Sequence, residues 1–329
     1  MVWVLLGKRR GDNNQMIALA DALGLPYEPK ALTCNLLRGI RFLRDERLLY
    51  LSRAARKSLS PPWPDIVIAL GYDSIPVSRA IRSRSGGRTR LVHIGNPRTT
   101  LDDIDLVITS PQYRLGDARN VLALPFPVGN PAREVTPTTE EEGWLRTHPR
   151  PRRLVAIGGS TRQWKIDIAE LGRALATLKA KRRRSGGSVI AITSRRTPAS
   201  ISRFLESSLA ECTDACVHNF PRFPVLLAKS DEIHVTADSV SMLSEAILTG
   251  KPVGMIPVTR SMRGGIDQWM RRVGLSLKSH TDMPRFWRFL SDSRLVGPVG
   301  SPVASNVPDT IATAVEAVRE MLQRPPARP

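Results

Sequence analysis

Three polar turns in the second half of the chain each follow an apolar stretch of the kind that forms a buried strand. They are "GGST" after "RLVAI", "TSRR" after "SVIAI", and "ADSVS" after "EIHVT". Backbone N–H groups, hydroxyls and guanidinium groups all donate hydrogen bonds, so turns of this composition are suited to bind phosphate. The pattern therefore indicates a site for a phosphorylated ligand.

The first two turns combine close backbone approach with positive charge. Gly158 and Gly159 let a ligand come near the backbone, and the pair Arg195 and Arg196 can neutralise a diphosphate through bidentate hydrogen bonds. Each turn also has a structural interpretation, because glycine turns and exposed basic turns commonly follow strands. Three such turns on one predicted sheet favour binding. The predicted nucleotide- and diphosphate-binding residues are Gly158, Gly159, Ser160, Thr161, Thr193, Ser194, Arg195, Arg196, Asp238, Ser239, Ser241 and Glu245.

The third turn opens a helix and carries an acid with two interpretations. Asp238, Ser239 and Ser241 have short polar side chains that can cap the helix. Glu245 follows Ser241 by four residues, which places it near the first helical turn, where a carboxylate complements the helix dipole. The same carboxylate can accept hydrogen bonds from two ribose hydroxyls.

The first half offers candidates for a general base. Asp12 lies in the Gly- and Asn-rich turn "GKRRGDNNQ". It is our preferred general base, which would remove a proton from the hydroxyl of a second substrate, the acceptor, and Asp73 is an alternative. His93 falls inside a strand pattern, which favours a hydrogen-bonded core histidine. The residues predicted to hold an acceptor or a phosphate are Gly11, Asn14 and Gln15, which could equally cap the first helix.

The sequence gives no sign of a metal site or a resident cofactor. Asp103 and Asp105 form an Asp-x-Asp pair, but they open a strand, at the wrong end for a ligand. Cys212, Cys216 and His218 lack a second ligand pair at zinc spacing. We therefore predict no metal and no cofactor.

These residues need two α/β halves to position them. The apolar strand segments, separated mostly by helical patterns, are 2–6, 64–71, 89–97, 104–110 and 120–129 in the first half and 153–160, 186–196, 214–220, 231–239 and 252–258 in the second. Near-continuous apolar strands that alternate with helices indicate parallel sheets covered on both faces. We predict an α/β fold of two Rossmann-like domains facing across a cleft, with ligands at the carboxyl ends of the strands.

A Pro-, Thr- and charge-rich stretch at 130–152, with a short helix in its middle, is the predicted link. The predicted division is an N-terminal domain over 1–135 on the acceptor and membrane side, a C-terminal domain over 150–305 on the nucleotide-sugar side, a helix over 306–323 and a disordered tail over 324–329.

Charge and composition restrict the partners. The 329 residues carry 49 basic and 30 acidic side chains, a net charge of +19, and 41% are hydrophobic, which excludes a disordered chain. Aromatic residues make up only 5% and no nucleic-acid motif is present, so we expect no nucleic-acid partner. The segment 36–57 alternates apolar and basic residues and suggests either a solvated basic helix or one lying on an anionic membrane.

The opening residues lack the features of a signal peptide. No window approaches the length of apolar sequence that a transmembrane helix needs. The few cysteines favour a reduced compartment. We therefore expect a cytoplasmic protein that is peripheral on the inner face of the cytoplasmic membrane.

Three segments carry a resemblance to a known family. "GDNNQMIALADALGL", "SRRTP" and "VTADSVSMLSEAILTGKPV" resemble the bacterial branch of the mitochondrial-fission Elm (elongated mitochondria) family. The resemblance covers nearly the whole chain and implies a GT-B-like fold. Plant members are described as fission factors on the outer mitochondrial membrane that recruit a dynamin-related protein, and bacterial members are often labelled epimerase-like.

Two segments depart from the family pattern and put the substrate in question. Residues 220–223 read Phe-Pro-Arg-Phe in place of a more usual Asn-Pro-Tyr segment, and "SMRGGIDQWMRRVGL" lacks the Lys- and Phe-rich stretch expected there.

Taken together, the residues and the resemblance favour a metal-independent GT-B-type glycosyltransferase. Its partners would be a nucleotide-sugar donor and a lipid-linked or envelope acceptor at the cytoplasmic membrane face. The alternatives are a non-catalytic recruitment or scaffold protein on the same fold, and a sugar-nucleotide epimerase.

Overall fold

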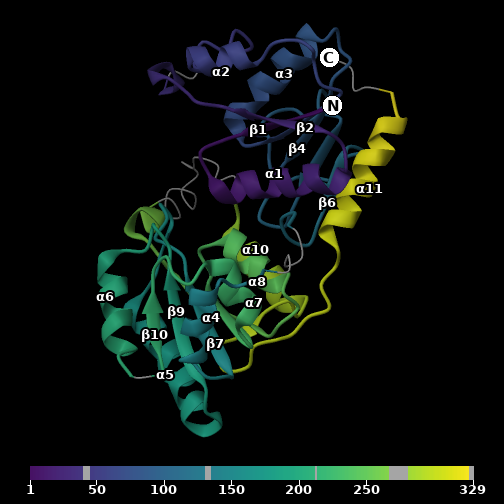
Figure 1. The fold of residues 1–329 in the computed structure, drawn as a ribbon. Helices are drawn as coiled ribbons and strands as arrows, with labels where there is room; N and C mark the ends of the chain where they lie inside the picture. Colours follow the sequence, from purple (N-terminus) through teal and green to yellow (C-terminus); the bar gives the residue numbers. More distant parts are fainter. Residues whose placement is uncertain (40–44, 130–134, 212, 267–280, 326–329) are drawn as a thin grey trace. The chain divides into compact units, whose positions relative to one another are not determined.

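The computed structural model describes residues 1–39, 45–129, 135–211, 213–266 and 281–325. The chain divides into two compact units. The N-terminal unit comprises Met1–Asn130, His280–Asp282 and Pro308–Pro329, and the C-terminal unit comprises Pro131–Ser279 and Met283–Val307. The chain's last helix therefore belongs with its first residues (Figure 1).

The N-terminal unit is built on a six-stranded parallel sheet in the order β2-β1-β3-β4-β5-β6. Its strands are β1 (Val2–Leu6), β2 (Tyr27–Ala31), β3 (Ile66–Leu70), β4 (Arg90–Ile94), β5 (Leu106–Thr109) and β6 (Val121–Ala123). The chain passes from β1 outward to β2 and then returns to the other side of β1, so the strand order reverses between β1 and β3.

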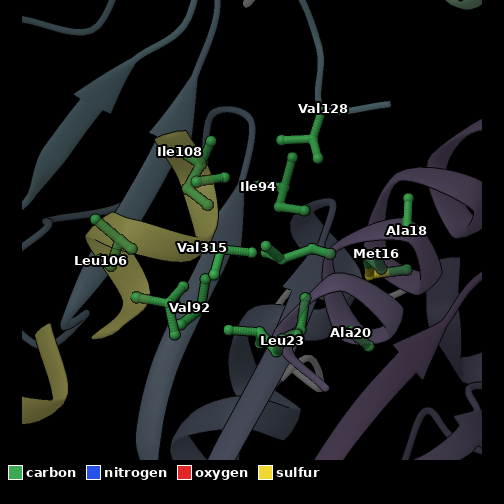
Figure 2. Close-up of a cluster of buried hydrophobic side chains, with 14 of the residues drawn as sticks. Met16, Ala18, Ala20, Leu23, Val92, Ile94, Leu106, Ile108, Val128 and Val315 are labelled. Atoms are coloured by element: carbon green, nitrogen blue, oxygen red, sulfur yellow. The ribbon is translucent and has the colours of Figure 1, made fainter. Parts of the chain in front are cut away.

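Both faces of this sheet are covered by helices. Alternate residues of each strand point to opposite faces and so join two different cores. Val2 and Val4 of β1 join a core that includes α1 (Arg10–Leu23) and α11 (Thr310–Gln323), whereas Trp3 and Leu5 join one that includes α2 (Arg53–Ser58) and α3 (Ile75–Arg84). Figure 2 shows the first core, in which side chains of α1, α11 and the strands meet.

A buried arginine fixes the end of α11. Arg90, at the start of β4, donates hydrogen bonds of 2.6 Å each to the carbonyl oxygens of Met321 and Arg324. Its guanidinium also lies 2.8 Å from the carboxylate of Asp105, which pairs with the buried Arg82 as well. Because a helix leaves its last carbonyls without intrahelical donors, Arg90 supplies what the end of α11 lacks.

The C-terminal unit repeats the architecture with the order β10-β9-β7-β11-β12-β14, again parallel throughout. Its strands are β7 (Arg152–Ile157), β9 (Ser188–Thr193), β10 (Ala215–Val217), β11 (Glu232–Thr236), β12 (Val253–Ile256) and β14 (Gly297–Pro298). Its helices are α4 (Thr139–Arg146), α5 (Ile168–Ser185), α6 (Ala199–Ser208), α7 (Phe223–Lys229), α8 (Val240–Ile247) and α10 (Met283–Asp292). Here the strand order reverses between β7 and β11.

Helix α4 lies in the stretch predicted as the link and is fixed by Glu141. Thr138 and Glu141 form a reciprocal capping box. Arg222 donates to both carboxylate oxygens of Glu141, at 2.8 and 2.6 Å, and these hydrogen bonds lower the pKa of Glu141 to about 2. Arg222 belongs to one of the two departures from the family pattern, and its observed contacts hold α4 beside the start of α7.

A small aromatic cluster lies beyond the end of β11. The antiparallel strands β8 (Trp164–Lys165) and β13 (Thr259–Arg260) form a two-stranded ribbon. Trp164 packs edge-on against Trp287 of α10, with ring centroids 4.6 Å apart, and the Arg260 guanidinium lies 4.6 Å above the Trp164 ring. The Trp287 indole N–H donates to the carbonyl oxygen of Ala237, which ties α10 to the segment after β11.

The predicted α/β fold is confirmed, and each of the ten predicted strand segments contains a strand. Edge strand β2, with the sequence YEPKA, was not predicted. The turn predicted over residues 7–15 was too long, because α1 already begins at Arg10.

The segment 36–57 does not form the basic helix that we considered. Within its described part, a 3-10 helix (Leu36–Gly39) and turns precede α2, and Cys34 bridges to Leu51. Arg41 and Arg44 lie outside the described residues, as does most of the predicted tail. Among the described helices, none combines the length and the apolar character that crossing a membrane requires.

Candidate functional site

The candidate site of the C-terminal unit lies where its strand order reverses. β7 and β11 are neighbours, and the chain leaves them toward opposite edges of the sheet. Their carboxyl ends lead into the Gly158–Gly159 turn and into the turn that contains Asp238. In open parallel sheets this position is where ligands bind.

Hydrogen bonds tie the three predicted turns together. The Gly158 N–H donates to the Thr236 hydroxyl and the Gly159 N–H donates to Asp238 Oδ2, each at 2.8 Å. The Gly158 carbonyl accepts from the hydroxyls of Ser194 and Thr197, at 2.7 and 2.6 Å. The turns after β7, β9 and β11 therefore form one connected surface, as their positions in the sequence predicted.

The glycines are required by close packing. A Cβ on Gly158 would lie 2.3 Å from Asp238 Oδ2, and one on Gly159 would lie 2.5 Å from the Arg196 carbonyl oxygen. Both positions are too crowded for any side chain. The first turn thus serves to pack three turns together, in addition to whatever it offers a ligand.

Among the predicted phosphate ligands of the first two turns, some side chains are exposed, whereas Thr161 and Thr193, like Ser194, already form hydrogen bonds within the protein. Ser160, Arg195 and Arg196 have exposed side chains at this edge. Thr161 instead closes a turn with Trp164, to which its N–H donates at 2.8 Å. The Thr193 hydroxyl is 2.6 Å from His218 Nδ1, and the other ring nitrogen of His218 is 3.0 Å from Glu206.

Helix α8 begins earlier than predicted, so Ser241 lies inside the helix and its acid lies farther along. Ser239 is the N-cap, and its hydroxyl accepts from the Met242 N–H at 3.4 Å. Because the helix starts at Val240, Glu245 falls in the second turn and the first turn carries no acid. The interpretation of Glu245 as a partner of the helix dipole was therefore wrong, since that effect is confined to the first turn. Its half-buried carboxylate remains a candidate for the ribose.

The N-terminal unit has a second polar edge, at the carboxyl ends of β3, β4 and β5. A small cavity there is lined by Gln15, Leu70, Gly95, Ser110 and Tyr113, among others. Gln15 was predicted, whereas Ser110 and Tyr113 were not, because no motif marks them. The cavity places a predicted acceptor residue beside strand ends, where a ligand of this fold class would lie.

Asp12 lies in the first turn of α1, close to this cavity. Its side chain is half-buried, and burial raises its pKa, opposed by the charge of Arg9. Burial also raises the pKa of Tyr113, and the negative charge of Asp12 adds to that effect. A carboxylate with a raised pKa is better suited to act as a base than an ordinary surface acid.

The other predicted residues of α1 differ in their surroundings. Gly11 is half-buried and Asn14 is exposed. Asn13, which was not predicted, fixes the turn before the helix: its amide exchanges two hydrogen bonds of 2.9 Å with the backbone of Gly7.

The two alternative bases are less suitable. Asp73 forms an ion pair with Arg38 at 2.5 Å. His93 is a buried core residue, as predicted, but neither ring nitrogen has a hydrogen-bond partner among the described residues, which differs from the satisfied histidine expected. Burial lowers the pKa of His93 to about 3, so its imidazole is a poor base.

The described residues contain no cluster of three His, Cys, Asp or Glu side chains that could hold a metal ion. Cys212 lies outside them. Burial raises the pKa of Cys216 to about 11, which disfavours the thiolate that metals bind.

The packing of the glycine turn predicts the effect of a methyl group. We expect Gly159→Ala to destabilise the protein by about 1–3 kcal/mol, because the backbone of Arg196 must move. The matched control is Gly172→Ala inside α5, where the nearest atom, Phe204 Cζ, is 3.5 Å away; it should stabilise by about 0.5–1 kcal/mol. Thermal and urea unfolding of both variants measure this, and equal stabilities would show that the turn has room to spare.

The buried imidazole of His93 predicts a pH dependence. Its pKa is about 3 in the folded protein and about 6.5 when unfolded. The unfolded chain therefore binds the extra proton first, and stability that is complete above pH 6.5 is lost as pH falls toward 3. Between pH 7 and pH 5, the wild type should lose about 2 kcal/mol more than His93→Met. Equal losses in urea unfolding at the two pH values would contradict this.

Comparison with solved structures shows the fold class. The UDP-GlcNAc 2-epimerase of Methanocaldococcus jannaschii aligns over 98% of this chain and 99% of its own, with a TM-score of 0.53 and 12% identity. Acinetobacter baumannii MurG aligns over 97% and 92%, with a TM-score of 0.50 and 14% identity. Os79 of O. sativa, solved with UDP, aligns over 98% and 95%, with a TM-score of 0.50 and 13% identity. The fold is therefore that of GT-B enzymes.

Comparison of sequences shows the family. The Mitochondrial fission ELM1 protein of Arabidopsis thaliana is 27% identical over 239 residues, which are 61% of this chain and 53% of that protein. The chain thus spans about half the length of the curated relative it matches. The family model for Mitochondrial fission ELM1 matches residues 10–273. The chain belongs to the Mitochondrial fission ELM1 family.

Proposed function

We propose that the protein is a metal-independent glycosyltransferase of the GT-B type. It moves a sugar from a nucleotide donor to a lipid-linked or envelope acceptor at the inner face of the cytoplasmic membrane. The observation that carries the proposal is the joining of three polar turns at the strand-order reversal of the C-terminal unit.

Charge at this edge supports donor binding. Arg195 and Arg196 expose guanidinium groups beside the Gly158–Gly159 turn, and Ser160 and Ser241 add hydroxyls. Positive charge and hydrogen-bond donors stabilise a diphosphate as it leaves with the electron pair of the broken bond. Two arginines supply that charge, so the reaction we propose assigns no role to a metal.

The nature of the nucleotide is suggested by proteins of the same fold. Os79 was solved with UDP, and the Methanocaldococcus jannaschii enzyme is a UDP-GlcNAc 2-epimerase. A uridine diphosphate sugar is therefore the first donor to test. The second of these proteins also favours an epimerase as the alternative function of this chain.

We assign the base to Asp12. Its carboxylate would take the proton of the acceptor hydroxyl while that oxygen bonds to the anomeric carbon. The bond from that carbon to the diphosphate oxygen breaks, and the nucleotide diphosphate departs. Burial that raises the pKa of Asp12 supports this role, as do the adjacent Tyr113 and the cavity that Tyr113 and Gln15 line.

Nucleotide binding is the first test. The purified protein should melt at a higher temperature with one of UDP, GDP, ADP, CDP or CMP, equally with and without Mg²⁺, because a ligand of the folded state stabilises it. At 100 times its Kd the ligand adds about 2.7 kcal/mol. Glu245→Ala should lose most of the shift while keeping the melting temperature of the free protein. If a folded sample gives no shift with any nucleotide, the result contradicts the proposed donor site and favours the non-catalytic scaffold.

Substitution of Asp12 tests the chemistry separately. Asp12→Asn should lower turnover about 10²–10⁴-fold, because a general base is lost, while the thermal shift by nucleotide stays unchanged. Asp73→Asn is the control and should retain turnover, since Asp73 is paired with Arg38. Transfer of radiolabelled sugar to membrane extract measures both. Turnover that survives Asp12→Asn removes this residue from the mechanism.

Two exposed leucines at the start of the 3-10 helix after β2 support the proposed membrane location. Leu36 is 99% exposed and Leu37 follows it, beside the exposed Arg38. Exposed Arg47, Arg53 and Arg56 follow along the chain, and such basic residues attract anionic lipid. Insertion of the leucines with the arginines at the headgroups is the arrangement we propose.

Leu36→Ser should weaken binding to liposomes that contain phosphatidylglycerol by about tenfold, since it removes the apolar surface that would be buried. The matched control is Leu25→Ser, at a residue that is 41% exposed in the same unit, and it should leave binding unchanged. Flotation of both variants with anionic and neutral vesicles measures the effect. Equal flotation of the two would place the membrane contact elsewhere.

A further inference from the structure

The glycine turn, which was expected to approach a bound phosphate, already contacts the carboxyl group of Asp238. Asp238 Oδ2 accepts the Gly159 N–H at 2.8 Å. The same oxygen would lie 2.3 Å from a Cβ at Gly158, so the carboxyl group lies against the backbone of the turn. The Gly159 N–H is therefore already engaged by a side chain of the protein.

The second oxygen of Asp238 is in an unusual position. Asp238 is only 8% exposed, and its Oδ1 is buried with no hydrogen-bond partner among the described residues. A buried polar atom without a partner costs free energy, and a buried carboxylate costs more than a neutral carboxyl group. Burial accordingly raises the pKa of Asp238.

The groups around Asp238 come from three elements. Thr236 of β11 and the Gly159 N–H after β7 donate to the carboxyl group, and both lower its pKa. Arg196, in the turn after β9, is the charged group near it, and its guanidinium also lowers the pKa. Arg196 is exposed, so the same guanidinium is free to turn toward a ligand.

A diphosphate bound at this edge brings negative charge next to a carboxylate. Like charges at short range disfavour the ionised form of a carboxyl group. Such a ligand also draws Arg196 toward itself, which removes part of the positive charge that favours the ionised form of Asp238. Both effects act in the same direction and favour uptake of a proton.

We propose that Asp238 takes up one proton from solvent when the diphosphate of a nucleotide sugar binds. The new Oδ1–H donates to a phosphate oxygen, while Oδ2 keeps the Gly159 N–H. The inference rests on the proposed nucleotide-sugar site and adds to it that a neutral carboxyl group is one of the donors that bind the diphosphate.

The proposal predicts tighter binding in mild acid. Where free Asp238 is ionised and bound Asp238 is protonated, affinity falls about tenfold for each unit rise in pH, since one proton accompanies each ligand. In Asp238→Asn the amide nitrogen takes the place of Oδ1–H, and the amide oxygen still accepts from Gly159. That variant should bind with an affinity that does not change with pH.

Isothermal titration calorimetry tests this with UDP-N-acetylglucosamine, GDP-mannose and ADP-glucose between pH 5.5 and 8.5. The diphosphate of such sugars is a diester and does not titrate in this range. Titration in buffers of different ionisation enthalpy counts the protons taken up, and we expect close to one in the wild type and none in Asp238→Asn. The control is His218→Gln, which removes the imidazole that contacts Thr193 near this edge and should keep the uptake.

The possible outcomes distinguish a failure of this inference from a failure of the proposed function. Binding of a nucleotide sugar by the wild type without proton uptake overturns the role of Asp238 and leaves the site in place. Failure of all three sugars to bind at any pH overturns the proposed function and the inference together. The wild-type proton count needs no variant, so the test holds even if Asp238→Asn does not fold.

Discussion

The hydrogen bonds made by the backbone of Gly158 and Gly159 are the constraint on which the C-terminal site depends. They connect the ends of three parallel strands, and all four partners are side chains: Thr236, Asp238, Ser194 and Thr197. A parallel sheet brings strand ends to one edge, but it does not by itself fix the turns relative to one another. Here the absence of Cβ atoms at two positions lets the turns touch, and polar side chains of Ser194, Thr197 and Asp238 lock the contact.

The two units share one architecture, but their strand ends carry different side chains. In the C-terminal unit the strand ends carry exposed arginines and hydroxyls, which suit a charged donor. In the N-terminal unit they border a small cavity with Gln15, Ser110 and Tyr113, near an acid whose pKa is raised by burial. An uncharged cavity with both apolar and polar lining and one nearby carboxylate suits a hydroxyl that must lose a proton. This division of roles is what the proposed transfer reaction requires, and an epimerase would require acid–base groups around the donor sugar itself.

Long apolar patterns in the sequence predicted the fold. The directions in which individual side chains point could not be predicted from these patterns. The buried strands β1, β3, β4, β7 and β9 consist mostly of apolar residues, so each was predicted. β2 was missed because YEPKA pairs on one side only and carries polar residues and a proline. The N-cap Ser239 was predicted from its residue type, whereas Glu245 was placed one turn too early, because the start of α8 depends on which hydroxyl caps it. That Asp238 would point back into the glycine turn could not be read from spacing, since its partner lies 79 residues away in the chain.

The attachment of α11 to the N-terminal unit has a consequence for synthesis of the chain. Ala314, Val315 and Val318 of α11 are part of the core that includes α1, and Arg90 holds the end of the helix. The ribosome makes these residues only after the whole C-terminal unit. In the domain that is translated first, the part of this core that α11 covers therefore stays exposed until α11 emerges, whereas the domain translated second can complete its own sheet earlier. Domains usually fold in the order of their synthesis. In this protein the N-terminal domain, whose synthesis begins first, completes its core last.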